Sequence, residues 1–224
     1  NQAVRIMNHL AAWFTHRIVT YTQDYAENSA FLRRYMHKLR VIPPPVELPE
    51  VSIESVADFK LRTNPNEQSP VIGMAARFAT EKGVEVLLDA LPHVLDKYPR
   101  AQVQFAGSYQ NIMGEQDYFA RLYPRIQKHE ENGNWVFLGN LGPHDMARFY
   151  PNLDALVMSS LNSTEAFGLV QIEAMINGAP CLASNLPGVR QPVKLHEMGK
   201  IFPIGDSAAL AEALLEVLSN KQAY

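Results

Sequence analysis

The chain has 224 residues, enough for one complete domain and part of a second. Hydrophobic residues make up 47% of it and charged residues 19%, so it can bury a core and is not a disordered segment. The formal net charge of −3 excludes a strong overall field that would recruit nucleic acid or an anionic membrane, and we expect no nucleic-acid partner.

A single cysteine, Cys181, excludes an intrachain disulfide framework and a cysteine-based zinc cluster. It lies in the apolar run 180–184, which is typical of a small buried side chain. No apolar run approaches the ~20 residues that span a bilayer, and the N-terminus lacks the layout of a signal peptide. We therefore expect a soluble, cytoplasmic protein.

Residues 1–45 carry patterns for two helices and two strands. The predicted order is helix, strand, helix, strand, over about 4–14, 17–22, 27–36 and 39–42. Three prolines at 43–45 stop the last strand. Two strands and two helices cannot close a domain alone. Residues 46–69 show no sustained period and are predicted to be a linker.

From residue 70 onward, short β-type runs alternate with amphipathic helical patterns. The predicted strands are 70–76, 101–107, 135–139, 154–160, 179–185 and 200–204. Helices are predicted near 84–95, 115–129, 144–150 and 168–177, with a last helix capped by Asp206. Such alternation requires parallel pairing with right-handed crossovers, so we predict an α/β fold with a doubly wound, Rossmann-like parallel sheet. These sheets bind ligands at the C-terminal ends of their strands.

The strongest functional signal is the segment 160–180, which follows a predicted strand and then starts a helix. Backbone N–H groups near Gly168, Leu169 and Val170 have no partner inside that helix, and with the helix dipole they make a site for phosphate. Gly168, after Phe167, lets the backbone approach a ligand closely. The alternative is an ordinary surface helix.

Two glutamates flank this helix start. Glu165, before the helix, can accept hydrogen bonds from sugar hydroxyls, and Glu173, inside it, can bind a ribose diol, because a carboxylate accepts two hydrogen bonds at once. Their spacing alone means little, and both could be solvated surface residues. The nearby Arg190 suits a structural role as well as a ligand-binding one.

A second motif, at 73–83, lies in the loop after the first strand of the domain. Its cations Arg77 and Lys82 are placed to neutralise a diphosphate leaving group, or else are solvated surface charges. No dinucleotide fingerprint, P-loop or Asp-x-Asp is present, and the seven His show no metal-ligand spacing. We therefore expect neither a metal nor a cofactor.

Together these motifs resemble the C-terminal domain of family 4 glycosyltransferases of the GT-B fold, over about 71–217. The stretches that carry the resemblance are ARFATEKGVEVLLDAL, FLGNL, NSTEAFGLVQIEAM and NGAPCLASNLPGVRQPV. Glu165 and Glu173 match the family's E-x7-E pair, and Arg77 and Lys82 match its cations on the donor diphosphate. Leu138 and Gly139 match its loop against the nucleobase.

The resemblance implies retaining, metal-independent transfer of a hexose from a UDP- or GDP-sugar in glycan biosynthesis, with the nucleotide-sugar as substrate. Arg77, Lys82 and Glu165 would be the catalytic residues. Residues 1–45 resemble the tail of the N-terminal domain, which in this family binds a sugar or lipid-linked acceptor, and 70–224 the donor domain. We therefore expect donor binding without turnover, and possible self-association through residues 1–45.

Two other readings stay open at this point. A sugar phosphorylase of similar architecture would bind inorganic phosphate where the donor phosphate lies. A non-catalytic nucleotide-binding module could reuse the same fold, because fold does not fix function.

Overall fold

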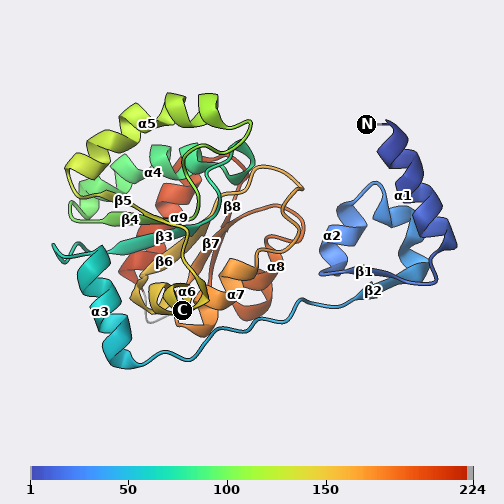
Figure 1. The fold of residues 1–224 in the computed structure, drawn as a ribbon, viewed down its shortest axis with the longest axis horizontal. Helices are drawn as coiled ribbons and strands as arrows, with labels where there is room; N and C mark the ends of the chain where they lie inside the picture. The colour runs from blue at the N-terminus through green and yellow to red at the C-terminus, as the bar shows by residue number, and fades with distance from the viewer. Residues whose placement is uncertain (1, 221–223) are drawn as a thin grey trace.

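Six parallel strands form the central sheet, in the order β5-β4-β3-β6-β7-β8 (Figure 1). The computed structural model describes residues 2–220 and 224. The strands are β3 (Val71–Ala75), β4 (Gln102–Ala106), β5 (Trp135–Gly139), β6 (Ala155–Met158), β7 (Cys181–Ser184) and β8 (Gly199–Phe202). Each was expected from the sequence, so the predicted doubly wound sheet is confirmed.

The sheet is built outward from β3 in both directions. Ile72 of β3 is in register with Val103 of β4 on one side and with Ala155 of β6 on the other. The chain first adds β4 and β5 on one side of β3 and then adds β6, β7 and β8 on the other. The direction of winding therefore reverses between β3 and β6.

Helices cover both faces of this sheet. Figure 1 shows α4 and α5 on one side, and α6, α7 and α8 on the other. The helices are α4 (Val84–Lys97), α5 (Gln116–Glu131), α6 (Pro143–Phe149), α7 (Leu169–Ile176), α8 (Gln191–His196) and α9 (Ser207–Ser219). The carboxylate of Asp206 accepts a hydrogen bond from the Ala209 amide, which confirms the predicted cap of the last helix. The short α8 was not expected.

Two hydrophobic clusters fill the spaces between sheet and helices. The first joins α4, α5 and α9 to the sheet, and the second lies under α6, α7 and α8. Cys181, in β7, belongs to the second cluster and is fully buried, and burial raises the pKa of its thiol. The expectation of a small buried side chain at this position is confirmed.

A helix occupies part of the segment that was predicted to be a linker. It is α3 (Ile53–Thr63), and the Ser52 side chain caps it by accepting from the Ser55 amide. Phe59 is 2% exposed and lies in the second cluster, whereas Leu61 is 62% exposed. The expectation of an aperiodic segment was wrong here because the apolar residues of this helix do not share one face.

Residues 2–45 form a separate N-terminal unit. It contains α1 (Gln2–Phe14), β1 (Ile18–Thr20), α2 (Gln23–Asn28), a 3₁₀ helix (Leu32–Lys38) and β2 (Leu39–Val41). As expected, it has two strands, and they pair in parallel. The predicted helix at 27–36 was wrong: the Thr22 side chain caps α2 by accepting from the Tyr25 amide, and the backbone becomes extended at Ser29.

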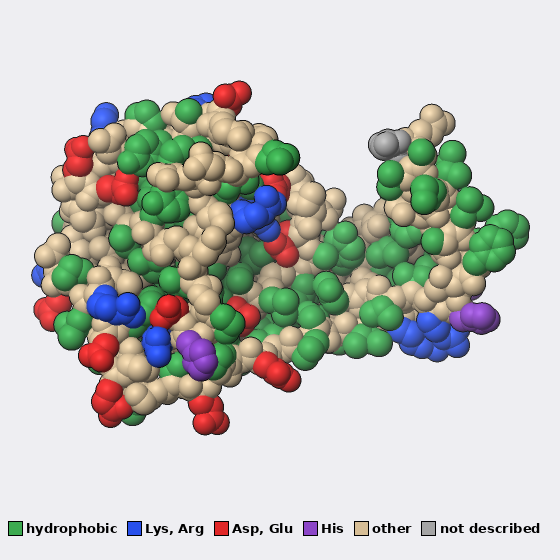
Figure 2. Space-filling model, in the orientation of Figure 1, with side chains coloured by type: hydrophobic (Ala, Val, Ile, Leu, Met, Phe, Trp, Pro, Cys, Tyr) green, Lys and Arg blue, Asp and Glu red, His purple; other side chains and the backbone are tan. Residues whose placement is uncertain are grey.

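Much of the apolar surface of this unit is exposed. Figure 2 shows hydrophobic side chains spread over it, and those of α1 that are more than two-fifths exposed are Val4, Ile6, Met7, Leu10, Trp13 and Phe14. Contiguous apolar surface of this kind favours association, so self-association of residues 1–45 stays a prediction. In the described part of the chain, no helix has the length and apolar character needed to cross a membrane.

The packing of α3 gives a stability prediction. Phe59→Ala should lower the free energy of unfolding by about 3–5 kcal/mol, because it removes a buried ring and leaves a cavity between α3 and α6. Leu61→Ala, on the same helix, should change it by less than about 0.5 kcal/mol, since that side chain is exposed. Urea denaturation measures both, and equal effects would mean that α3 is not anchored through Phe59.

Candidate functional site

A cavity of about 410 Å³ lies where the winding of the sheet reverses, at the C-terminal ends of β3 and β6. The crossovers that leave these two strands run in opposite directions, which opens a crevice between them. Its lining residues come from the ends of both strands, the loops that follow them, the start of α7, and one residue of the N-terminal unit. They are Tyr21, Met74, Ala75, Ala76, Arg77, Lys82, Met158, Ser159, Ser160 and 164–170.

Hydrogen bonds hold the loops after β3 and β6 together. The Ser159 hydroxyl donates to the carbonyls of Lys82, at 3.0 Å, and Gly83, at 2.9 Å. The Leu161 amide donates to the Glu81 carbonyl at 2.9 Å. Gly83 has φ +63°, and a Cβ there would lie 2.3 Å from the Ser159 carbonyl oxygen, so the close approach requires glycine.

Two ion pairs lie at the cavity, one of them spanning it. Lys82, after β3, places its Nζ 2.7 Å from Glu165 Oε2, after β6, and both side chains are about one-fifth exposed. Arg77 pairs with Glu81 at 2.8 Å and is more than half exposed. The predicted cations are therefore both at the cavity, and each has a carboxylate partner.

The start of α7 forms another wall. Gly168 has φ +84° and precedes the helix, and a Cβ there would lie 2.4 Å from the Met158 sulfur. Leu169 and Val170, the first residues of the helix, line the cavity together with Phe167. The structure thus places the predicted helix start, with its amide groups, at the strand ends.

Glu173 lies outside the set of residues that line the cavity, one turn after Leu169 on α7. Its carboxylate accepts a hydrogen bond from the hydroxyl of Tyr150. Burial and, next, this carboxylate raise the pKa of Tyr150, so its hydroxyl stays protonated and able to donate.

Leu138 and Gly139 also lie outside the cavity lining, because they end β5, which is two strands away from β3 in the sheet. Across the described residues, no group of three or more His, Cys, Asp or Glu is arranged as a metal site.

The sequence did not point to Tyr21, the first residue after β1, which lines the cavity. The centroid of its ring lies 6.1 Å from the centroid of the Phe167 ring. The rule that parallel strands present their C-terminal ends to ligands could have singled it out. For Arg190 the structure shows a structural role, because it pairs with Asp24 of the N-terminal unit at 2.6 Å.

Comparisons with known proteins support a single family. The chain is 30% identical over 177 residues to a phosphatidyl-myo-inositol mannosyltransferase of Mycobacterium leprae. This alignment covers 78% of this chain and 44% of the relative. The chain thus spans less than half the length of that curated relative.

Solved structures show the same fold. Anabaena HepE, crystallised with UDP-glucose, superimposes with a TM-score of 0.82 at 24% identity, over 98% of this chain and 58% of that chain. The C-terminal domain of a group 1 glycosyltransferase from Francisella tularensis gives a TM-score of 0.61 at 21% identity, over 73% of this chain and 84% of that chain. These likenesses place the six-stranded domain in the GT-B fold.

The family model described as "Glycosyl transferases group 1" matches residues 56–224, which is most of the chain and includes α4 to α9 and the whole cavity apart from Tyr21. The chain therefore belongs to the group 1 glycosyltransferases.

Proposed function

We propose that this chain is the donor-binding part of an enzyme that transfers a sugar from a nucleoside diphospho-sugar to an acceptor, with retention and without a metal ion. The observation that carries the proposal is the convergence of Arg77, Lys82, Glu165 and the start of α7 on one cavity at the β3–β6 reversal. The Anabaena structures with UDP and with UDP-glucose support a nucleotide-sugar as the ligand of this fold.

In this proposal the diphosphate lies at the start of α7. The amides of Leu169 and Val170 and the positive end of the helix dipole favour a phosphate there. Departure of the diphosphate builds negative charge, which Arg77 and Lys82 stabilise in place of a metal ion. The backbone that carries Lys82 is held in place before the reaction, because hydrogen bonds join the loop after β3 to the loop after β6.

Glu165 orients the transferred sugar through its hydroxyls, and we assign it no covalent role. A diphosphate in the cavity competes with Glu165 for Lys82, whose Nζ lies 2.7 Å from that carboxylate. Once Lys82 turns to the phosphate, both carboxylate oxygens of Glu165 can accept hydrogen bonds from the sugar. Diphosphate binding therefore prepares the residue that holds the sugar.

Glu173 binds the ribose in this proposal. The Tyr150 hydroxyl occupies one of its carboxylate oxygens and fixes its orientation, and the other oxygen can accept from a ribose hydroxyl. From there the nucleobase reaches toward Leu138 and Gly139, because the end of β5 lies farther along the same edge of the sheet. The acceptor, a sugar or lipid-linked group, binds outside this domain.

Replacing Glu173 and replacing Glu165 should have different effects on the affinity for the nucleoside diphosphate. Glu173→Ala should weaken binding of UDP or GDP about ten- to a hundredfold, because a hydrogen bond to a charged group contributes roughly 1.5–3 kcal/mol. Glu165→Ala should leave that affinity unchanged or raise it, since the diphosphate no longer competes for Lys82. Calorimetry measures both.

Two further variants serve as controls. Glu212→Ala, on the exposed side of α9, should behave as the parent. Glu173→Gln keeps an acceptor for Tyr150 and separates loss of the fold from loss of the ribose contact. Parent-like nucleotide binding by Glu173→Ala would show the ribose assignment to be wrong.

We also predict that the chain binds the donor without turnover. We would screen UDP, GDP, ADP and their sugars by thermal shift. Nucleotides that carry one of the three bases should raise the melting temperature of the chain, because a ligand that binds only the folded state stabilises it. An assay with the same donor and a sugar or lipid-linked acceptor should give no steady transfer. Steady transfer by this chain would contradict the prediction, and a response to sugar phosphates alone would indicate a phosphorylase.

A further inference from the structure

One side-chain cluster joins the N-terminal unit to the donor domain, and we name it the clasp: Asp24, Gly188 and Arg190. Arg190 donates to both oxygens of Asp24, from Nη2 at 2.6 Å and from Nε at 2.9 Å. The Gly188 amide adds a third hydrogen bond to Asp24 at 2.8 Å. Such a bidentate, charge-assisted arrangement fixes the orientation of both partners.

The clasp is partly buried, with both charged side chains less than one-fifth exposed. Burial by itself would raise the pKa of Asp24, but the hydrogen bonds from Arg190 and Gly188 and the guanidinium charge hold that pKa below its ordinary value. Asp24 is therefore charged at neutral pH, where it pairs with Arg190.

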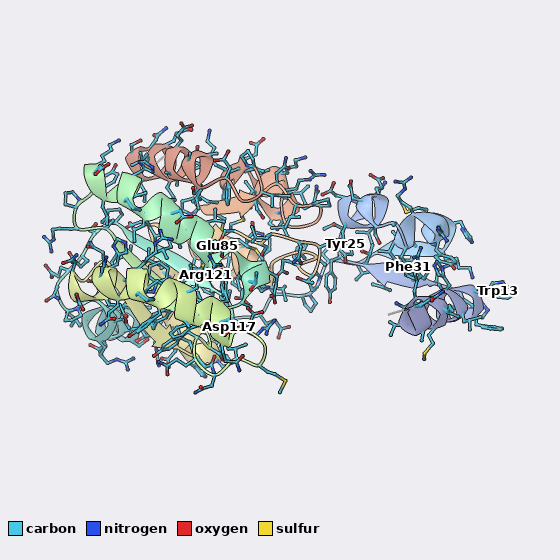
Figure 3. All side chains as sticks on the ribbon, turned by 90° about the horizontal axis from the view of Figure 1, so that it is seen from above. Trp13, Tyr25, Phe31, Glu85, Asp117 and Arg121 are labelled. Carbon is cyan, nitrogen blue, oxygen red and sulfur yellow. The ribbon has the colours of Figure 1, made fainter. Side chains whose placement is uncertain are left out.

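On the donor side, the clasp is in direct contact with the wall of the cavity. Gly188 has φ +85°, and a Cβ there would lie 2.2 Å from the carbonyl oxygen of Ala166, which lines the cavity. The hydroxyl of Tyr25 also donates to the Ser163 carbonyl at 3.3 Å. Figure 3 shows Tyr25 at the junction of the two units, whereas Phe31 and Trp13 lie far from it.

On the N-terminal side, the clasp fixes the place of Tyr21. Asp24 is in the first turn of α2, which the Thr22 side chain caps, so little freedom remains in the backbone between Tyr21 and Asp24. Tyr21 lines the donor cavity beside Phe167. Phe167 follows Glu165 by two positions in the chain. Its ring therefore lies on the side of the cavity formed by the segment that carries Glu165, the proposed sugar partner.

We propose that the clasp holds Tyr21 against the sugar of the bound nucleotide-sugar, so that Asp24 and Arg190 are positioning residues for the donor although neither lines its cavity. The inference rests on the proposed function. A tyrosine ring can pack on the apolar face of a sugar, and it gives nothing comparable to a free nucleoside diphosphate that ends at the phosphates. The clasp therefore contributes to the affinity for the sugar rather than for the nucleotide.

The test compares UDP with UDP-glucose, and GDP with GDP-mannose, by calorimetry on the full chain. Asp24→Ala and Arg190→Gln should each weaken binding of the nucleotide-sugar about three- to tenfold and leave the nucleoside diphosphate within twofold of the parent. Tyr21→Ala should do the same. The double variant Tyr21→Ala/Asp24→Ala should lose no more than Tyr21→Ala alone, because Asp24 acts through Tyr21.

A matched control breaks an ion pair elsewhere. Arg125→Gln breaks the ion pair of Arg125 with Asp89, which joins α5 to α4. Arg125 lies one turn after Arg121, and Figure 3 shows Arg121 away from the N-terminal unit. This variant should change neither the affinity for the nucleotide nor that for the nucleotide-sugar. In Asp24→Ala, amide exchange should become faster in residues 18–28. Unchanged exchange in the central sheet would show that the donor domain is intact in this variant.

The outcomes separate the two proposals. If the parent binds none of the nucleotides in the thermal-shift screen, the proposed function fails. If the parent binds, but Asp24→Ala and Arg190→Gln keep the parent's affinity for the nucleotide-sugar, the role of the clasp is overturned. Additive losses in the double variant, or equal losses for nucleotide and nucleotide-sugar, would also overturn it.

Discussion

Parallel pairing of β3 with both β4 and β6 is the constraint on which the site depends. Every crossover must cover a face of the sheet with a helix, and the helices that follow β3 and β6 leave in opposite directions. The cavity lies at these two strand ends, where the chain leaves toward opposite faces of the sheet. Lys82 comes from one loop and Glu165 from the other, so each ion of the pair is supplied by a different crossover.

The charges at this cavity are nearly balanced, and that balance affects which ligands can enter. Arg77 and Lys82 each face a carboxylate, so an incoming anion must compete with an existing partner. An anion with one charge gains little by displacing a carboxylate from Arg77 or Lys82. A diphosphate carries more than one negative charge and can also accept hydrogen bonds from the amides at the start of α7. The arrangement therefore favours multiply charged groups without exposing a strongly positive surface.

The sequence predicted the central sheet well, because its strands are short apolar runs and most of the helices that follow them have one apolar face. The motifs at Arg77, Lys82 and Glu165 could be brought together by the single rule that ligands bind at the C-terminal edge of a parallel sheet. The clasp could not be predicted in this way. Asp24 and Arg190 are 166 positions apart, and neither lies in a local pattern that names its partner. The α3 helix escaped notice because its apolar residues do not share one face, so Phe59 is buried and Leu61 is exposed.

The burial of Cys181 makes the surface of this protein free of reactive thiol, because the chain has no other cysteine and burial raises the pKa of this one. A cysteine introduced on exposed α1 and another on exposed α5 would therefore be the only positions that take a maleimide dye. Energy transfer between the two dyes would report the distance between the N-terminal unit and the domain of the six-stranded sheet in solution. The native cysteine does not have to be removed to prepare the protein for that measurement.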